Sequence, residues 1–153
     1  MLLLTLVLAG AQAGALPAKL SAFDLLIGGC WRHDLSAVAS DTHCFEAMYG
    51  GVHVRDRHEV KLNGKVVYSG ETIYSNDGGD TVFTYYNSLG GVGRGSVTQD
   101  RTSLCFKGTM RASPAEKPQP LFAIWKIIDR DHYEVNNLTS LQRFSRVKSQ
   151  PSR

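Results

Sequence analysis

The sequence has little cysteine, no block of like charge and no long apolar run after its first residues. Its three cysteines, Cys30, Cys44 and Cys105, have none of the spacings typical of a metal site. The net charge of +3 comes from basic residues scattered singly, mostly beside Asp or Glu, so the sequence carries no electrostatic signature of nucleic-acid binding. Its 153 residues, 42% of them hydrophobic, are enough for one domain with one core.

The chain begins with MLLLTLVLAGAQAGALP, which is apolar at first and then rich in small residues. Ala11-Gln12-Ala13 has the small-x-small form after which signal peptidases cut, so we expect residues 1–13 to be a signal peptide and the mature protein to be periplasmic or secreted. The apolar run is too short to span a bilayer, so we expect no transmembrane segment in the mature chain. The alternative is that this segment is retained, because no Lys or Arg precedes it.

Residues 14–26 form a lead-in whose apolar side chains lie three or four positions apart, which predicts a short helix. From Ile27 the pattern alternates, and turn signals such as Asn63-Gly64 and Asp77-Gly78 recur about every ten residues. The segments between these turns amount to about ten strands, with no pattern for a second helix that could connect parallel strands. The sequence therefore predicts an all-β fold, a closed antiparallel up-and-down barrel over residues 27–147, followed by a frayed tail over 148–153.

Gly29-Cys30-Trp31 lies at the start of the first predicted strand, after the short helix. In this position the Gly-x-Trp motif resembles that of the calycin superfamily, which contains lipocalins, fatty-acid-binding-type barrels and nitrobindin-like barrels. The stretches YGGVHVRDRHEV, YSGETIY and YYNSLGGVGRG are similar to those of bacterial lipocalin-like proteins of unassigned function. The resemblance implies that Trp31 packs across the closed end of the barrel against an Arg of the last strand, for which Arg143 and Arg146 are the candidates.

The same resemblance bears on a haem cofactor. In haem-binding nitrobindins the Gly-x-Trp is followed by further glycines and the last strands supply a His. Here Arg32-His33 follows the Trp and the last predicted strand contains no His. We therefore expect no cofactor.

Tight turns also predict which side chains point into the barrel. If Asn63-Gly64 is a two-residue turn, Asp56 faces Glu71 and His58 faces Ser69. In the strand before this turn the even positions are largely apolar and the odd positions are charged or His. The even positions are therefore predicted to face the interior.

Two further glycine turns extend this register. Gly50-Gly51 places His43 inside and opposite His58, and Asp77-Gly78 places Thr84 and Tyr86 inside. Apolar residues surround these polar ones, and an apolar cavity with a few convergent polar groups is typical of a small-molecule site. The predicted ligand-binding residues are His43, Phe45, Asp56, His58, Ser69, Glu71, Thr84, Tyr86 and Phe106.

We expect this site to hold a small apolar or amphipathic molecule, and we assign no catalytic or metal-binding residue. Three alternatives remain. The polar groups could form a satisfied structural network, or an Asp56–His58 or Glu71–His pair could act as a general base. A metal or haem carrier is the third, and for a metal His43, His58 and Glu71 share the predicted inward face.

The cysteines offer one more test of the register. Cys30 and Cys44 flank the first predicted hairpin and share its outward face. If this hairpin pairs the two positions directly, they lie within disulfide reach, whereas a shift of one pair separates them.

Overall fold

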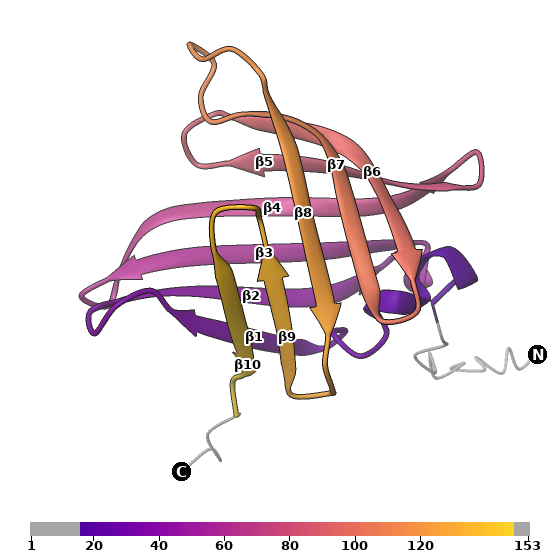
Figure 1. The fold of residues 1–153 in the computed structure, drawn as a ribbon, viewed down its shortest axis with the longest axis horizontal. Helices are drawn as coiled ribbons and strands as arrows, with labels where there is room; N and C mark the ends of the chain where they lie inside the picture. Colours follow the sequence, from indigo (N-terminus) through magenta and orange to yellow (C-terminus); the bar gives the residue numbers. More distant parts are fainter. Residues whose placement is uncertain (1–15, 149–153) are drawn as a thin grey trace, which may run out of the picture.

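The computed structural model describes residues 16–148 as a closed barrel of antiparallel strands that follow one another around the wall in chain order (Figure 1). The strands are β1 (Gly29–Asp34), β2 (Ala39–Met48), β3 (His53–Leu62), β4 (Lys65–Asp77), β5 (Asp80–Asn87), β6 (Val92–Asp100), β7 (Ser103–Arg111), β8 (Gln119–Ile127), β9 (His132–Asn136) and β10 (Leu141–Arg146). The last strand pairs with the first, so the predicted closed antiparallel barrel is confirmed. The predicted signal peptide at 1–13, and all but the first residue of the predicted tail at 148–153, lie outside the described residues.

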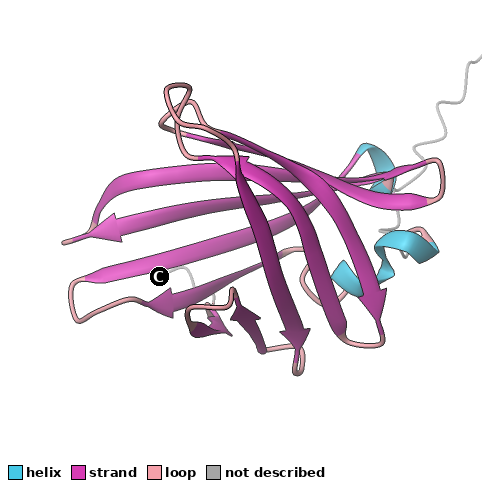
Figure 2. Cartoon of the chain, turned by 45° about the horizontal axis from the view of Figure 1, so that its top comes forward, coloured by secondary structure: helices cyan, strands magenta, loops and turns pink. Residues whose placement is uncertain are grey.

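A short 3₁₀ helix, η1 (Ala18–Phe23), lies at one end of the barrel (Figure 2). Its apolar residues Leu20 and Phe23 are fully buried, and the ring of Phe23 stacks on Tyr74 with 4.4 Å between the ring centroids. A second 3₁₀ turn, η2 (Tyr49–Gly51), joins β2 to β3. Neither helix in the described part of the chain has the length and hydropathy needed to cross a membrane.

The Gly-x-Trp motif lies at the same end. Trp31 is fully buried, and the guanidinium of Arg146 lies 4.5 Å from the centre of its ring. Arg146 also donates to the backbone oxygens of Leu25 and Arg130. A Cβ atom on Gly29 would come within 2.6 Å of the Trp31 ring, so glycine leaves the space that this ring occupies.

Of the two candidate partners of Trp31, Arg143 is wrong. Arg143 lies on the opposite face of β10, where its guanidinium is 3.8 Å from the Glu134 carboxylate. Arg146 lies at the end of β10 that pairs with Trp31, which brings it over the ring.

The predicted register holds through β1, β2 and β3. Cys30 pairs with Cys44 and forms a disulfide with it, and His43 pairs with His58 across β2 and β3. The alternation of the β3 sequence is reproduced, with Val54 and Asp56 buried and Arg57 and Glu59 exposed. Asn63-Gly64 forms the turn after β3 with positive φ at both residues, as a type I′ turn requires.

The predicted register is wrong beyond this turn because β4 contains a bulge. Lys61 pairs with Val66 but Val60 pairs with Tyr68, so one extra residue of β4 is accommodated and every later residue moves to the other face. Asp56 therefore faces Thr72, not Glu71. The four residues that this shift places on the outer face are Ser69, Glu71, Thr84 and Tyr86.

The turn after β4 also differs from the prediction. Asp77 pairs directly with Asp80, so Gly78-Gly79 occupies the turn that was expected at Asp77-Gly78. Both glycines have positive φ, at 59° and 96°. This pairing sets Thr72 opposite Tyr85. It moves each partner by two positions and so leaves the faces unchanged, and the bulge in β4 is what turns Phe83 and Tyr85 inward.

The disulfide gives the first testable prediction. We expect the native protein to show one free thiol, Cys105, and three after reduction. Cys30 and Cys44 are 14 residues apart, and closing a loop of this length stabilises a fold by about 3 kcal/mol. Replacing both cysteines by serine should lower the free energy of unfolding by about that amount in urea titrations, whereas Cys105→Ser should change it by less than about 1 kcal/mol. Three free thiols in the non-reduced protein would contradict the pairing.

Candidate functional site

A cavity of about 330 Å³ lies inside the barrel. Aromatic and aliphatic side chains form most of its wall, and several polar side chains lie together on one side. The lining residues are His43, Asp56, His58, Thr72, Tyr74, Phe83, Tyr85, Phe106, Met110, Leu121, Phe122, Ala123, Trp125, Val135 and Asn137. The volume and composition are typical of a small-molecule site.

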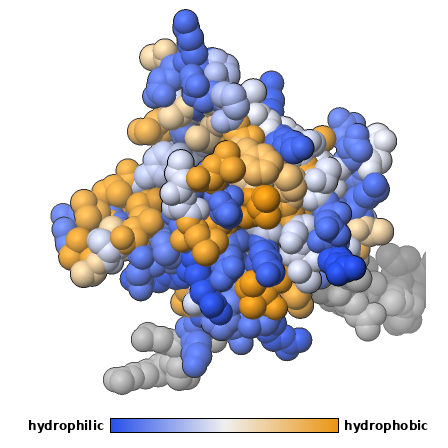
Figure 3. All heavy atoms as spheres, in the orientation of Figure 1, coloured by the Kyte–Doolittle hydropathy of each residue, from blue (hydrophilic) through white to orange (hydrophobic). Residues whose placement is uncertain are grey.

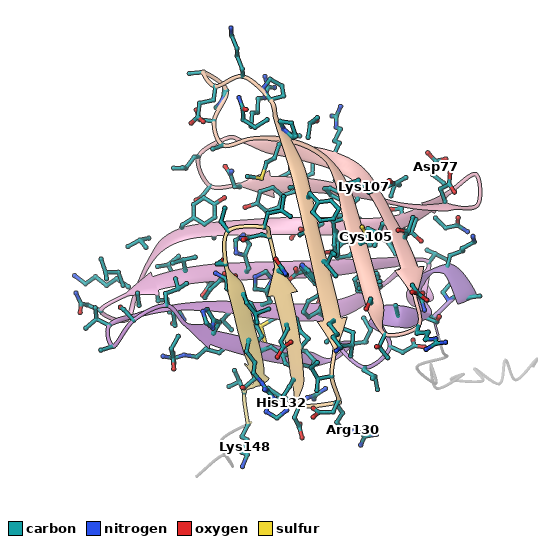
Figure 4. The ribbon with its side chains drawn as sticks, in the orientation of Figure 1. Asp77, Cys105, Lys107, Arg130, His132 and Lys148 are labelled. Atoms are coloured by element: carbon teal, nitrogen blue, oxygen red, sulfur yellow. A yellow bond between two sulfur atoms is a disulfide. The ribbon has the colours of Figure 1, made fainter. Side chains whose placement is uncertain are left out.

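The alternation of the strands explains which side chains reach this cavity. On β7, Phe106 is buried between Cys105 and Lys107, which are labelled in Figure 4 and belong to the opposite face of the strand. Across from it on β8, Ala123 pairs with Phe106 and leaves space because its side chain is small. The face of the molecule in Figure 3 shows hydrophobic residues in separate groups with hydrophilic ones between them.

The structure brings four of the predicted site residues to the cavity: His43, Asp56, His58 and Phe106. Phe45 is buried next to them, with its ring edge-on to Trp31 and Trp125. The inward orientation predicted for the remaining four is wrong. Three of these, Ser69, Glu71 and Tyr86, line a groove on the outer surface instead.

The polar side of the cavity is a continuous chain of contacts between side chains of β2, β3, β4 and β5. His43 Nδ1 lies 2.8 Å from Asp56 Oδ2, and His43 Nε2 lies 3.5 Å from Asp41 Oδ2. The other oxygen of Asp41 lies 3.4 Å from His58 Nδ1. We call Asp41, His43, Asp56 and His58 the polar cluster.

Two tyrosines extend this chain. His58 Nε2 is hydrogen-bonded to the Tyr85 hydroxyl at 3.0 Å, which is hydrogen-bonded to the Tyr68 hydroxyl at 2.5 Å. The bulge in β4 is what turns Tyr68 inward. Gly70 pairs with His58, and a Cβ atom there would come within 2.4 Å of His58 Nε2 and 2.6 Å of the Tyr85 hydroxyl, so glycine makes room for their hydrogen bond.

The carboxylates control the protonation of the cluster. Burial alone would lower the pKa of His43, but the charge of Asp56 and the hydrogen bonds and charge of Asp41 outweigh it and raise this pKa to about 10. Burial alone would raise the pKa of Asp41, but hydrogen bonds from His43 and His58 hold it well below its usual value. His43 is therefore an imidazolium between two carboxylates at neutral pH.

Burial also affects the tyrosines. It raises the pKa of Tyr85 well above its usual value, and the hydrogen bond with Tyr68 raises it further. The phenol is thus neutral at all ordinary pH values. It can donate one hydrogen bond and accept others.

Sequence reasoning missed Asp41, Tyr68 and Tyr85. Asp41 carried a usable signal, because it shares the alternation of His43 and Phe45 on the same strand. The bulge in β4 sets the inward faces of both tyrosines, and the sequence pattern did not predict this bulge.

Beside this cavity β8 extends past its neighbour β9. β9 pairs with residues 124–127 of β8, and residues 119–123 of β8 extend beyond this pairing. Phe122 of this segment and Asn137 of the β9–β10 loop both line the cavity. The nearby side chains of Leu138 and Leu141 are exposed by 74% and 66%. We call this stretch of β8 without a β9 partner, residues 119–123, the seam between β8 and β9.

The polar cluster also contains a set of metal-ligating groups. Asp41, His43 and His58 each offer one ligand atom, and these atoms lie within 4.8 Å of one another. Glu71, the third residue of the metal-carrier alternative, is on the outer face and is not part of this set. There, its carboxylate lies 3.7 Å from the Arg55 guanidinium.

No protein-family model matches the sequence, and a search of curated proteins finds no match. The site is therefore interpreted from its own geometry.

Proposed function

We propose that the protein is an exported, lipocalin-like barrel that binds a small, largely apolar molecule in its interior cavity. The observation that carries the proposal is a cavity of about 330 Å³ with mainly apolar walls and one polar side. The seam at residues 119–123 supports it, because a ligand needs a route through the wall.

Two further features support export and a lipocalin-like architecture. The Cys30–Cys44 disulfide suits an oxidising compartment, as expected for a periplasmic or secreted protein. Packing of Trp31 against Arg146 is the arrangement that a calycin-like barrel would have at its closed end.

The polar cluster favours a ligand without negative charge. The residues that line the cavity include neither Lys nor Arg. Asp41 and Asp56 contribute two carboxylates and His43 contributes one imidazolium, so the cluster carries no net positive charge whichever protonation state His58 adopts. A carboxylate or sulfonate in the cavity would find no net positive charge to compensate its own, and burying an uncompensated charge is costly. A hydroxyl, amine or amide head group would find acceptors and donors.

The charge preference can be measured with two dyes of similar shape. N-phenyl-1-naphthylamine is neutral, and 1-anilinonaphthalene-8-sulfonate carries a negative charge. We expect the neutral dye to bind in the cavity with enhanced fluorescence, and the anionic dye to bind at least about tenfold more weakly. Equal or tighter binding of the anionic dye would contradict the charge argument.

The place of binding is tested by filling the cavity. Ala123→Phe adds a ring between Phe106 and the opposite wall, and should weaken binding of N-phenyl-1-naphthylamine by at least about tenfold. Ile124→Phe is the matched control, because the next residue of β8 faces outward and is 38% exposed. It should leave dye affinity unchanged. If Ala123→Phe folds and binds the dye as well as the original protein, the dye does not occupy this cavity.

Native mass spectrometry of protein purified from its own host identifies the natural ligand. A retained small molecule should appear as a mass above that of the chain, and Ala123→Phe should lose it.

A further inference from the structure

Asp41, His43 and His58 place one carboxylate and two imidazoles together beside the cavity, which both imidazoles line. Two of these groups come from β2 and one from β3, so adjacent, paired strands hold them. We propose that these three residues bind a divalent transition-metal ion of the zinc type, with an open coordination position toward the cavity.

The spacing of the ligand atoms fits such an ion. Asp41 oxygens lie 3.5 Å from His43 Nε2 and 3.4 Å from His58 Nδ1. In a tetrahedral site with metal–ligand bonds near 2.0–2.1 Å, neighbouring ligand atoms are about 3.3–3.4 Å apart. These two distances involve different oxygens of Asp41, and the three ligand atoms lie within 4.8 Å of one another, so a small shift of the side chains brings them to the tetrahedral spacing. Two imidazoles and one carboxylate are a common ligand set for zinc and for non-haem iron.

The groups around these residues also suit a metal site. Metal-binding histidines usually have their other ring nitrogen hydrogen-bonded to a carboxylate, a carbonyl or a water, which sets the orientation of the ring. Here His43 has Asp56 on Nδ1 at 2.8 Å, and His58 has the Tyr85 hydroxyl on Nε2 at 3.0 Å. Each imidazole is therefore held by one nitrogen and directs the other toward Asp41.

Charge and access favour a cation at this place. Asp56 is only 2% exposed and pairs with the His43 imidazolium, so an ion that displaces the Nε2 proton of His43 takes over the compensation of this buried carboxylate. His43 and His58 line the cavity, so a water or a ligand atom could complete the coordination from that side.

This inference does not depend on the proposed organic ligand. An empty cavity can hold the metal alone, and Ala123→Phe, which should block the dye, leaves all three metal ligands in place. If dye binding fails and metal binding succeeds, only the proposed function is wrong. The opposite outcome overturns the metal site alone.

The test is a titration of the purified, metal-stripped protein with Zn²⁺ by calorimetry and with Co²⁺ by visible absorption. We expect one ion per chain, and Co²⁺ d–d bands of the intensity typical of four or five ligands. Asp41→Asn, His43→Gln and His58→Gln should each weaken Zn²⁺ binding by more than about 100-fold, and Asp56→Asn by about 10–100-fold.

His53→Gln is the matched control, because His53 is on the same strand as His58 but is hydrogen-bonded to Ser75. Glu71→Gln is the second control, because this carboxylate lies on the outer face. Neither should change the affinity. The proposal is overturned if the original protein binds neither ion, or if the controls weaken binding as much as the three ligand variants do.

A measurement on the original protein covers the case in which a variant does not fold. Long-range ¹H–¹⁵N spectra resolve the ring nitrogens of the five histidines. Zn²⁺ should shift His43 Nε2 and His58 Nδ1 the most, while the rings of His53 and His132 stay unchanged. Shifts confined to the other histidines would refute the assignment.

Discussion

Replacing Asp56 by alanine is expected to lower the free energy of unfolding by about 3–5 kcal/mol at pH 7. Its carboxylate is 2% exposed and accepts a hydrogen bond from His43. Without it, the buried imidazolium of His43 keeps only the longer contact with Asp41. Removing one partner of a buried ion pair leaves the other charge poorly compensated in a medium of low polarity. This is the physical reason for the large loss of stability. Urea unfolding followed by the fluorescence of Trp31 and Trp125 measures it.

Two further variants separate the effect of the Asp56 charge from the effect of removing a carboxylate in general. Asp56→Asn keeps an oxygen that accepts from His43 but removes the charge, so we expect a smaller loss, about 1–3 kcal/mol. Glu59→Ala removes a carboxylate from the outer face of the same strand, where it only contacts exposed Lys61, and should cost less than about 1 kcal/mol. Equal losses for Asp56→Ala and Glu59→Ala would show that the polar cluster contributes nothing specific to stability.

The first part of the barrel could be predicted because turns and alternation agree there. Glycines sit in the turn before β3 and Asn63-Gly64 follows it, and the charged odd positions of β3 admit one inward face. That agreement gave the correct pairing of His43 with His58, whereas the pairing of Cys30 with Cys44 had stayed conditional on the register of the first hairpin.

The second part of the barrel could not be predicted, because the sequence of β4 is compatible with either of its faces pointing inward. Both sets of alternate positions in KVVYSGETIY mix apolar and polar residues, so neither identifies the interior. No glycine lies at the bulge between Val66 and Tyr68, and Asp77-Gly78 and Gly78-Gly79 are both good turn sequences. A single extra residue therefore exchanged Glu71 for Thr72 inside the barrel. The packing of Tyr68 and Tyr85 around Gly70 favours the observed register of β4 over the predicted one, and the local sequence does not encode this packing.

The metal-free protein is also expected to lose stability steadily as the pH rises from 7 to 9. The pKa of His43 is about 10 in the fold, against 6.5 in the unfolded chain. The stabilisation is therefore complete below pH 6.5 and is lost as the pH rises toward 10, because only the folded state keeps the proton in this range. One proton corresponds to about 1.4 kcal/mol per pH unit, so the free energy of unfolding should fall by about 3 kcal/mol between pH 7 and pH 9.

His43→Gln is the control that isolates this proton, because glutamine can still donate to Asp56 but does not titrate. All proteins in the comparison should carry Cys105→Ser, since a free thiol can attack the Cys30–Cys44 disulfide at alkaline pH. We expect the stability of His43→Gln to be nearly independent of pH between 7 and 9. Asp56→Ala should reduce the slope, because the charge of Asp56 is the strongest influence that raises the pKa of His43. An equal slope in all three proteins would mean that His43 is not the group that loses the proton.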